Sequence, residues 1–150
     1  MRKILLTVGM LWLGVVGCGD VYESSIPSVA FSFTCNLAQS PYYQITTPGR
    51  FLKVTKNTSG VAVGYAGLII GQSVYSDGQT YLAFDAACPV EASRSVSLEV
   101  TDDGLGTAVC PECKATYDLS NGGGRSDGLG EEVLRRYSVR LSGQTLHVSN

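Results

Sequence analysis

The sequence predicts an all-β domain made of small antiparallel sheets, arranged as a sandwich or a small barrel. Short stretches rich in Val, Leu, Tyr and Thr recur over residues 28–150, each bounded by Gly, Asn, Asp or Ser. The chain contains 18 glycines, and no stretch after residue 20 keeps an apolar period of 3.6 residues over three turns. This pattern is typical of short strands joined by tight turns, and it indicates a single domain.

The N-terminus has the pattern of a secretion signal. The basic residues Arg2 and Lys3 precede an uncharged run over residues 4–17, which is shorter than the ~20 residues that a membrane-spanning helix needs. The run ends in Val-Val-Gly directly before Cys18, which resembles the lipobox of bacterial lipoproteins. That resemblance implies cleavage after residue 17 and lipidation of Cys18. We therefore expect an exported chain in the bacterial cell envelope, held to a membrane by its lipid.

Residues 18–27 show no periodicity and are expected to form a short tether before the domain. The domain begins with an alternating pattern over residues 28–35, in which Val29, Phe31, Phe33 and Cys35 share one side. A period of two predicts a half-buried strand. A connector over residues 36–49 contains two prolines and is expected to hold one helical turn at 37–40.

The remaining strand candidates follow at short intervals. Residues 76–79 and 142–144 are expected to form hairpin turns, because glycine accepts a positive φ, and the last two strands should therefore pair. The candidates are Phe51–Thr55, Val61–Val63, Gly67–Ile70, Tyr81–Asp85, Ser95–Thr101, Ala108–Val109, Thr116–Leu119, Leu134–Leu141 and Thr145–Ser149.

The charge balance argues against nucleic acid as a partner. Without Arg2 and Lys3, the mature chain would carry 9 basic and 13 acidic residues, a net charge of −4. Binding to phosphates requires clustered Lys and Arg, and after the signal the only adjacent basic pair is Arg135-Arg136.

Three cysteines are spaced for metal binding. Cys88 follows a predicted strand and is followed by Pro-Val-Glu91, and Cys110-Pro-Glu-Cys113 comes 22 positions after Cys88. Cysteines with two residues between them can direct both sulfurs at one ion across a tight turn. Free amides in the turn can donate to thiolate sulfur. Two such turns placed face to face would form a metal or cluster site.

At these residues the chain resembles the Rieske iron–sulfur family, which carries Cys-x-His in one loop and Cys-x-x-His in a second loop on an all-β fold. Residues 81–89 look like the strand and loop of the first box, and residues 110–119 look like the second box and the strand after it. The glycines at 122–124 resemble the turn that follows. The resemblance spans roughly residues 29–150 and implies a Rieske-like fold with a [2Fe–2S] cluster and one-electron transfer to an exported redox partner.

The ligand set departs from the family pattern. Val90 stands at the first histidine position, and Cys113 stands at the second. The only histidine, His147, lies in the last predicted strand, where it is expected to face solvent. A cluster held by two histidines therefore cannot form on the family pattern.

Three interpretations of the loops stay open. Cys88, Cys110 and Cys113 could bind one metal ion, first of all zinc, with Glu91 as the fourth ligand. The same four residues could hold an iron–sulfur cluster, although clusters normally take four thiolates. Alternatively no metal binds, and a disulfide clamps the loops, which the oxidising compartment favours. Cys35 is expected to be a buried small apolar residue, with a disulfide to a loop cysteine as the alternative.

Two classes of function follow from these interpretations. In the first, the chain is a metal- or cluster-binding lipoprotein with an accessory role in electron transfer. In the second, it is a structural or interaction lipoprotein whose loops are closed by zinc or a disulfide. No known catalytic signature is present, so no catalytic residue and no enzymatic activity of its own are expected.

Overall fold

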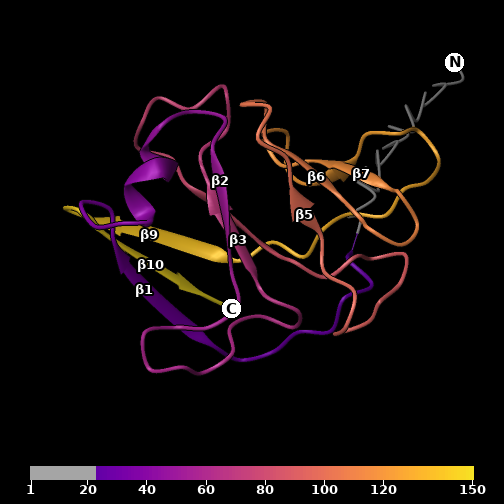
Figure 1. The fold of residues 1–150 in the computed structure, drawn as a ribbon, viewed down its shortest axis with the longest axis horizontal. Helices are drawn as coiled ribbons and strands as arrows, with labels where there is room; N and C mark the ends of the chain where they lie inside the picture. Colours follow the sequence, from indigo (N-terminus) through magenta and orange to yellow (C-terminus); the bar gives the residue numbers. More distant parts are fainter. Residues whose placement is uncertain (1–22) are drawn as a thin grey trace, which may run out of the picture.

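The computed structural model describes residues 23–150, which form three small antiparallel sheets and one short 3₁₀ helix (Figure 1). The signal segment and Cys18 lie outside these residues. Among residues 23–150, no helix is both long and apolar enough to cross a bilayer.

The first sheet joins the two ends of the domain. Its strand order is β1-β10-β9, and the turn between β9 and β10 contains Gly143 with φ of +60°. The pairing predicted for the last two strands is confirmed. The members are β1 (Ser32–Asn36), β9 (Ser138–Ser142) and β10 (Thr145–Ser149).

The second sheet lies between two apolar clusters, because two of its three strands are buried on both faces. In β3, Leu68 and Ile70 belong to one cluster and Ile69 to the other. In β4, Ala83 belongs to the first cluster and Phe84 to the second. Alternating side chains of a strand point to opposite faces, so this sheet links the two halves of the core. Its strands are β2 (Phe51–Val54), β3 (Leu68–Gly71) and β4 (Leu82–Asp85).

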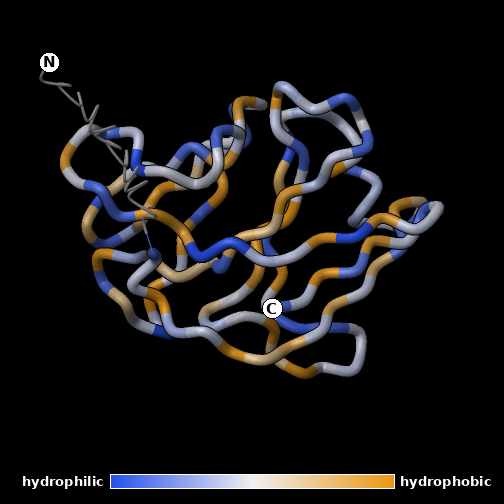
Figure 2. Tube along the Cα trace, turned by 180° about the vertical axis from the view of Figure 1, so that it is seen from behind, coloured by the Kyte–Doolittle hydropathy of each residue, from blue (hydrophilic) through white to orange (hydrophobic). Residues whose placement is uncertain are grey.

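The third sheet forms the lobe that carries the cysteine loops. Its strand order is β5-β6-β7-β8, and it packs over the second cluster through buried Ala108 and Tyr117. Figure 2 shows apolar stretches alternating with polar ones along the chain, as strands with one buried face require. Its strands are β5 (Glu99–Val100), β6 (Thr107–Val109), β7 (Thr116–Asp118) and β8 (Gly124–Arg125).

The predicted all-β class is confirmed, but several elements differ in extent. Residues 61–63 form only an isolated bridge at Ala62, because Gly60 and Gly64 on either side have positive φ. The candidate strand over residues 95–101 is reduced to β5 and a bridge at Ser97. The last but one strand starts at Ser138, four residues after the predicted start.

The helical turn of the connector also lies later than predicted. It is the 3₁₀ helix η1 (Tyr42–Thr46), which begins after Pro41 and buries Ile45. Proline fixes φ in the helical range and lacks an N–H, so it suits the position just before a helix. Residues 37–40 do form a turn, in which the Gln39 amide donates to the Asn36 carbonyl at 3.1 Å, but the regular helix follows the proline.

Cys35 is buried in the first apolar cluster, at 5% exposure, as predicted. Burial raises the pKa of this thiol from 9.0 to about 11. A raised pKa stabilises the fold below pH 9, and this stabilisation is lost as the pH rises from 9 to about 11.

We therefore expect the unfolding free energy to fall over that interval by about 2 kcal/mol more in the wild type than in Cys35→Ala. Urea titrations of both chains at several pH values, with metal removed by a chelator, would measure the difference. Parallel pH profiles would contradict this account of Cys35.

Candidate metal centre

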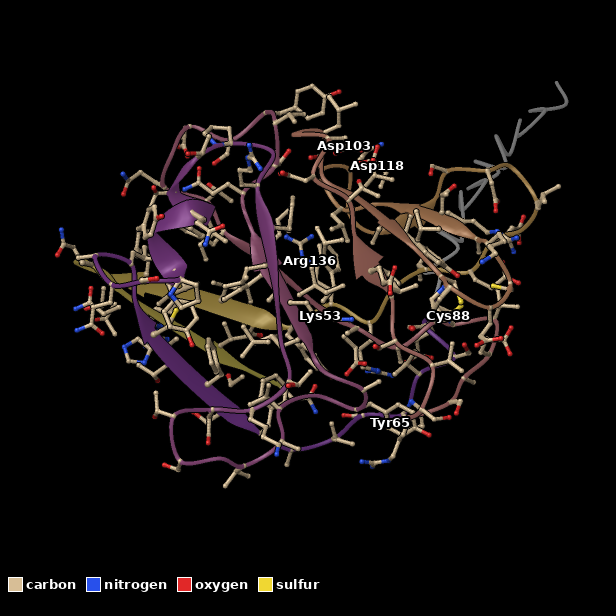
Figure 3. All side chains as sticks on the ribbon, viewed as in Figure 1. Lys53, Tyr65, Cys88, Asp103, Asp118 and Arg136 are labelled. Atoms are coloured by element: carbon tan, nitrogen blue, oxygen red, sulfur yellow. The ribbon has the colours of Figure 1, made fainter. Side chains whose placement is uncertain are left out.

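Two loops at one end of the third sheet carry the three cysteines. We call residues 88–92 the first cysteine loop and residues 110–114 the second. The first follows β4 after two buried alanines, and the second connects β6 to β7. Figure 3 shows sulfur atoms beside the labelled Cys88 in this lobe.

The two loops follow the same backbone path. Each starts with Cys-Pro, and in each the amide four residues on donates to the carbonyl of the leading cysteine: Ala92 to Cys88 at 2.8 Å and Lys114 to Cys110 at 3.2 Å. Ala92 and Lys114 have φ of +46° and +62°, and they are the only described non-glycine residues with positive φ. Left-handed non-glycine residues cost energy, so the surrounding bonds must hold both turns in place.

The loops bring the sulfurs of Cys88, Cys110 and Cys113 together. All three lie within 4.8 Å of one another, and Cys88 Sγ lies 3.6 Å from Cys113 Sγ. Cys88 and Cys110 are fully buried, and Cys113 is half-buried at the surface. The four cysteines of the described chain are free thiols.

The surroundings of Cys88 favour its thiolate. Burial alone disfavours the charged form, but the amides of Glu91 and Val90, the Tyr117 hydroxyl and the Cys110 thiol outweigh it. Together they hold the pKa of Cys88 below its ordinary value. A thiolate is the form that binds metals.

Cys110 and Tyr117 respond in the opposite direction. Burial raises the pKa of Cys110 to about 11, although the amides of Cys113 and Glu112 donate to it. Burial and the contact with Cys88 also raise the pKa of Tyr117. The Tyr117 hydroxyl therefore stays protonated and can donate to Cys88 Sγ, 3.7 Å away. Cys110 would lose its proton when an ion binds.

A buried carboxylate fixes the chain that enters the first cysteine loop. Asp85, at the end of β4, is fully buried and accepts the Ala87 amide at 2.8 Å and the Tyr137 hydroxyl at 2.6 Å. It also accepts the amides of Tyr65 and Ala66 from a neighbouring turn. Four donors satisfy this carboxylate, so it holds the turn, β4 and the loop entrance together.

The other predicted site residues lie around the three cysteines. Val90 is 42% exposed at the tip of the first cysteine loop. The Glu91 side chain is exposed and its carboxylate is outside the group of ligand atoms within 4.8 Å, so its role as the fourth ligand stays a prediction. His147 faces solvent on β10, beside Thr34 at 3.2 Å, as predicted. The lipidation of Cys18 falls outside the described residues.

The residues of the centre fit a metal ion. Two thiolates bound to one zinc ion at the tetrahedral angle lie about 3.8 Å apart, close to the 3.6 Å between Cys88 and Cys113. A disulfide would need about 2.05 Å. Three protein ligands leave the fourth position of a tetrahedral ion open to Glu91, water or another ligand.

Tyr117 and Asp85 are parts of the site that were not predicted from the sequence. The position of Tyr117, seven residues after Cys110, carries no signal without the register of β6 and β7. Asp85 is the one acidic residue in a run of apolar ones over residues 81–90, which is a usable signal of a buried and hydrogen-bonded carboxylate.

Comparison of the sequence with models of protein families gave no match, and comparison with curated proteins gave none. Solved structures do match. A chain from the complex of reduced oxygenase and oxidized ferredoxin in carbazole 1,9a-dioxygenase is 18% identical, with a TM-score of 0.50. The alignment covers 81% of this chain and 93% of that one. The fold is Rieske-like.

A second structure is described as the small subunit of an NADH-dependent nitrite reductase from Mycobacterium tuberculosis. It is 16% identical, with a TM-score of 0.45, and the alignment covers 82% of this chain and 97% of that one. The Rieske-like fold predicted from the two cysteine loops therefore agrees with the first match and with the all-β architecture.

Proposed function

We propose that this chain is an exported lipoprotein whose Rieske-like domain binds a metal centre through Cys88, Cys110 and Cys113. The observation that carries the proposal is the convergence of these three sulfurs within 4.8 Å. The amide and hydroxyl donors around Cys88 support it, because they stabilise a thiolate before any ion arrives. Cys18 would carry the lipid that holds the domain to the membrane of the cell envelope.

A single tetrahedral ion, first of all zinc, fits the three sulfurs best. Sulfurs that share one zinc ion lie at about the separation seen between Cys88 and Cys113. Zinc has no redox chemistry, so in this form the ion closes the two cysteine loops and the lipoprotein has a structural or interaction role.

An iron–sulfur cluster with accessory electron transfer is the second candidate. It is favoured by the likeness in fold to a chain of the oxygenase and ferredoxin complex. Cys88, Cys110 and Cys113 would supply three ligands and Glu91 the fourth. The cluster would supply one-electron chemistry, and the residues of this chain would bind it and donate hydrogen bonds to its sulfur ligands. An exported redox partner would then be required.

Metal analysis separates these forms. The full chain is purified without oxygen and without chelator, and its metal content and visible absorption are recorded. About one zinc per chain without visible absorption supports the single ion. Two irons per chain with visible absorption support the cluster. If neither metal is retained and two loop thiols resist alkylation until reduced, the metal proposal fails and the disulfide interpretation replaces it.

Glu91 has a specific test, because it occupies the same position in the first cysteine loop as Cys113 in the second. We expect Glu91→Ala to weaken metal retention more than His147→Ala. The second change removes a potential ligand on β10, in the sheet that does not carry the cysteine loops. Both side chains are exposed, so neither change should disturb the core. Competition with a chelator would measure retention in both variants. Equal retention would remove Glu91 from the site.

A further inference from the structure

The described chain begins directly beside the metal centre. The Ser25 hydroxyl donates to the carbonyl oxygen of Pro89 at 2.7 Å, and Pro89 is the residue between Cys88 and Val90 in the first cysteine loop. Figure 1 shows the start of the described chain next to the lobe of β5, β6 and β7. The segment expected to be a tether therefore contacts the site in its described part.

A second pair of contacts fixes the same segment. Ile26 is fully buried, and its carbonyl accepts a hydrogen bond from Arg135 Nε at 2.6 Å. The Arg135 carbonyl in turn accepts the Asp85 amide at 2.8 Å, at the end of β4 that leads to Cys88. Burial of the Ile26 side chain favours the docked position of this short segment.

Covalent geometry then limits the distance between lipid and site. Cys18 lies seven residues before Ser25. Seven residues span at most ~25 Å, a length that they reach only when the chain is fully extended. The turn between β9 and β10 lies at the opposite end of the domain, so the two ends differ in their distance from the lipid (Figure 1).

We propose that Ser25 and Ile26 hold the cysteine loops on the membrane-facing side of the domain, so that the partner of the metal centre is a membrane-embedded protein. This inference rests on the proposed lipidation of Cys18. The distance of at most ~25 Å between Cys18 and Ser25, which contacts the first cysteine loop, is smaller than the ~30 Å diameter of a small globular domain. A freely diffusing protein would not fit into that gap, whereas a membrane protein can present its surface there.

The orientation arises from the anchor and its contacts rather than from attraction to lipid charge. Glu23, Glu131 and Glu132 line one cavity with Ser25, at the point where the chain enters the domain. Three carboxylates at this end, of which Glu132 is paired with Arg125, give no attraction to anionic headgroups. The orientation should therefore persist on neutral membranes.

Energy transfer to lipid measures the orientation. A fluorescent amino acid is introduced at position 90 or, as the matched control, at position 144 in the distal turn; both wild-type residues are exposed. The full lipidated chain is bound to phosphatidylethanolamine and phosphatidylglycerol vesicles with acceptor-labelled headgroups. We expect the donor at 90 to lose more emission than the donor at 144. An insertion of about 20 Gly and Ser residues between Asp20 and Val21 should remove the difference.

Equal loss at both positions, or greater loss at 144, would overturn the inference. So would disappearance of the difference on vesicles without phosphatidylglycerol. Failure of the lipoprotein proposal is detected separately, because lipid labelling of the wild type would then match that of Cys18→Ser. For the partner, a photo-crosslinking amino acid at 90 should capture a membrane-spanning protein in cells and one at 144 should not. If the residue at position 90 captured only water-soluble proteins, the proposal of a membrane-embedded partner would be contradicted.

Discussion

Replacement of Cys88 by serine is expected to abolish metal retention. Cys88 is the leading residue of the first cysteine loop, and its sulfur receives the amide and hydroxyl donors that favour the thiolate. Loss of a supporting residue around a metal costs 10–100-fold in affinity, so loss of this ligand should cost more than about 100-fold. Metal content after dialysis against a weak chelator would measure the effect in Cys88→Ser and in the wild type.

Cys35→Ser is the matched control, because Cys35 is a buried thiol in the other apolar cluster. It should lower stability by leaving a hydroxyl among apolar side chains, while the metal content stays at the wild-type level. A Cys88→Ser chain that keeps its full metal content would contradict the assignment of the centre. Equal loss of metal from both variants would show that unfolding, and not the loss of a ligand, is responsible.

Replacement of Asp85 by alanine is expected to have the largest effect on stability. It would leave the amides of Tyr65, Ala66 and Ala87 and the hydroxyl of Tyr137 without their acceptor in a buried region. Each unsatisfied buried donor costs about 1–3 kcal/mol, and relaxation reduces the sum, so we expect a loss of about 4 kcal/mol. Urea unfolding of the metal-free chain would measure this value.

Tyr137→Phe removes one of the four donors and keeps the carboxylate. Its cost should be only about 1 kcal/mol, because Asp85 keeps three amide partners. Asp77→Ala, in an exposed turn, should cost far less than Asp85→Ala. If Asp85→Ala is no more destabilising than either control, then Asp85 does not hold the entrance of the first cysteine loop.

Gly64 explains why the turn next to Asp85 tolerates little change. It has φ of +68°, and a Cβ at this position would lie 2.8 Å from Asp85 Oδ2 and 2.4 Å from the Gly67 carbonyl oxygen. Glycine alone allows the turn to bring its amides onto the carboxylate.

The sequence was sufficient to predict the strands whose alternation is strong and local. The presence of β1 and of the β9–β10 hairpin follows from alternating apolar residues and from one glycine turn, although β1 and β9 each begin four residues after the predicted start. The predicted strand at 61–63 failed because its short apolar run says nothing about the positive φ of Gly60 and Gly64 on either side. Pairing with a neighbouring strand decides whether so short a segment becomes a strand, and a single sequence does not reveal which strands are neighbours.

The candidate site likewise has parts that the sequence predicts and parts that it does not. Each cysteine turn is a local feature that the sequence shows, whereas the meeting of the two turns was implied by the resemblance to the Rieske family. Tyr117 and Ser25 could not be predicted as neighbours of the first cysteine loop. Their contacts join residues 29 and 64 positions apart, and they depend on how β7 and the N-terminal segment pack.

The left-handed residues Ala92 and Lys114 have a consequence for how the centre is loaded. Hydrogen bonds within the backbone set the curvature of both loops and bring the three thiols together. In a zinc finger the metal organises the polypeptide. Here the polypeptide is the template, so the domain should survive stripping by a chelator with its sheets intact.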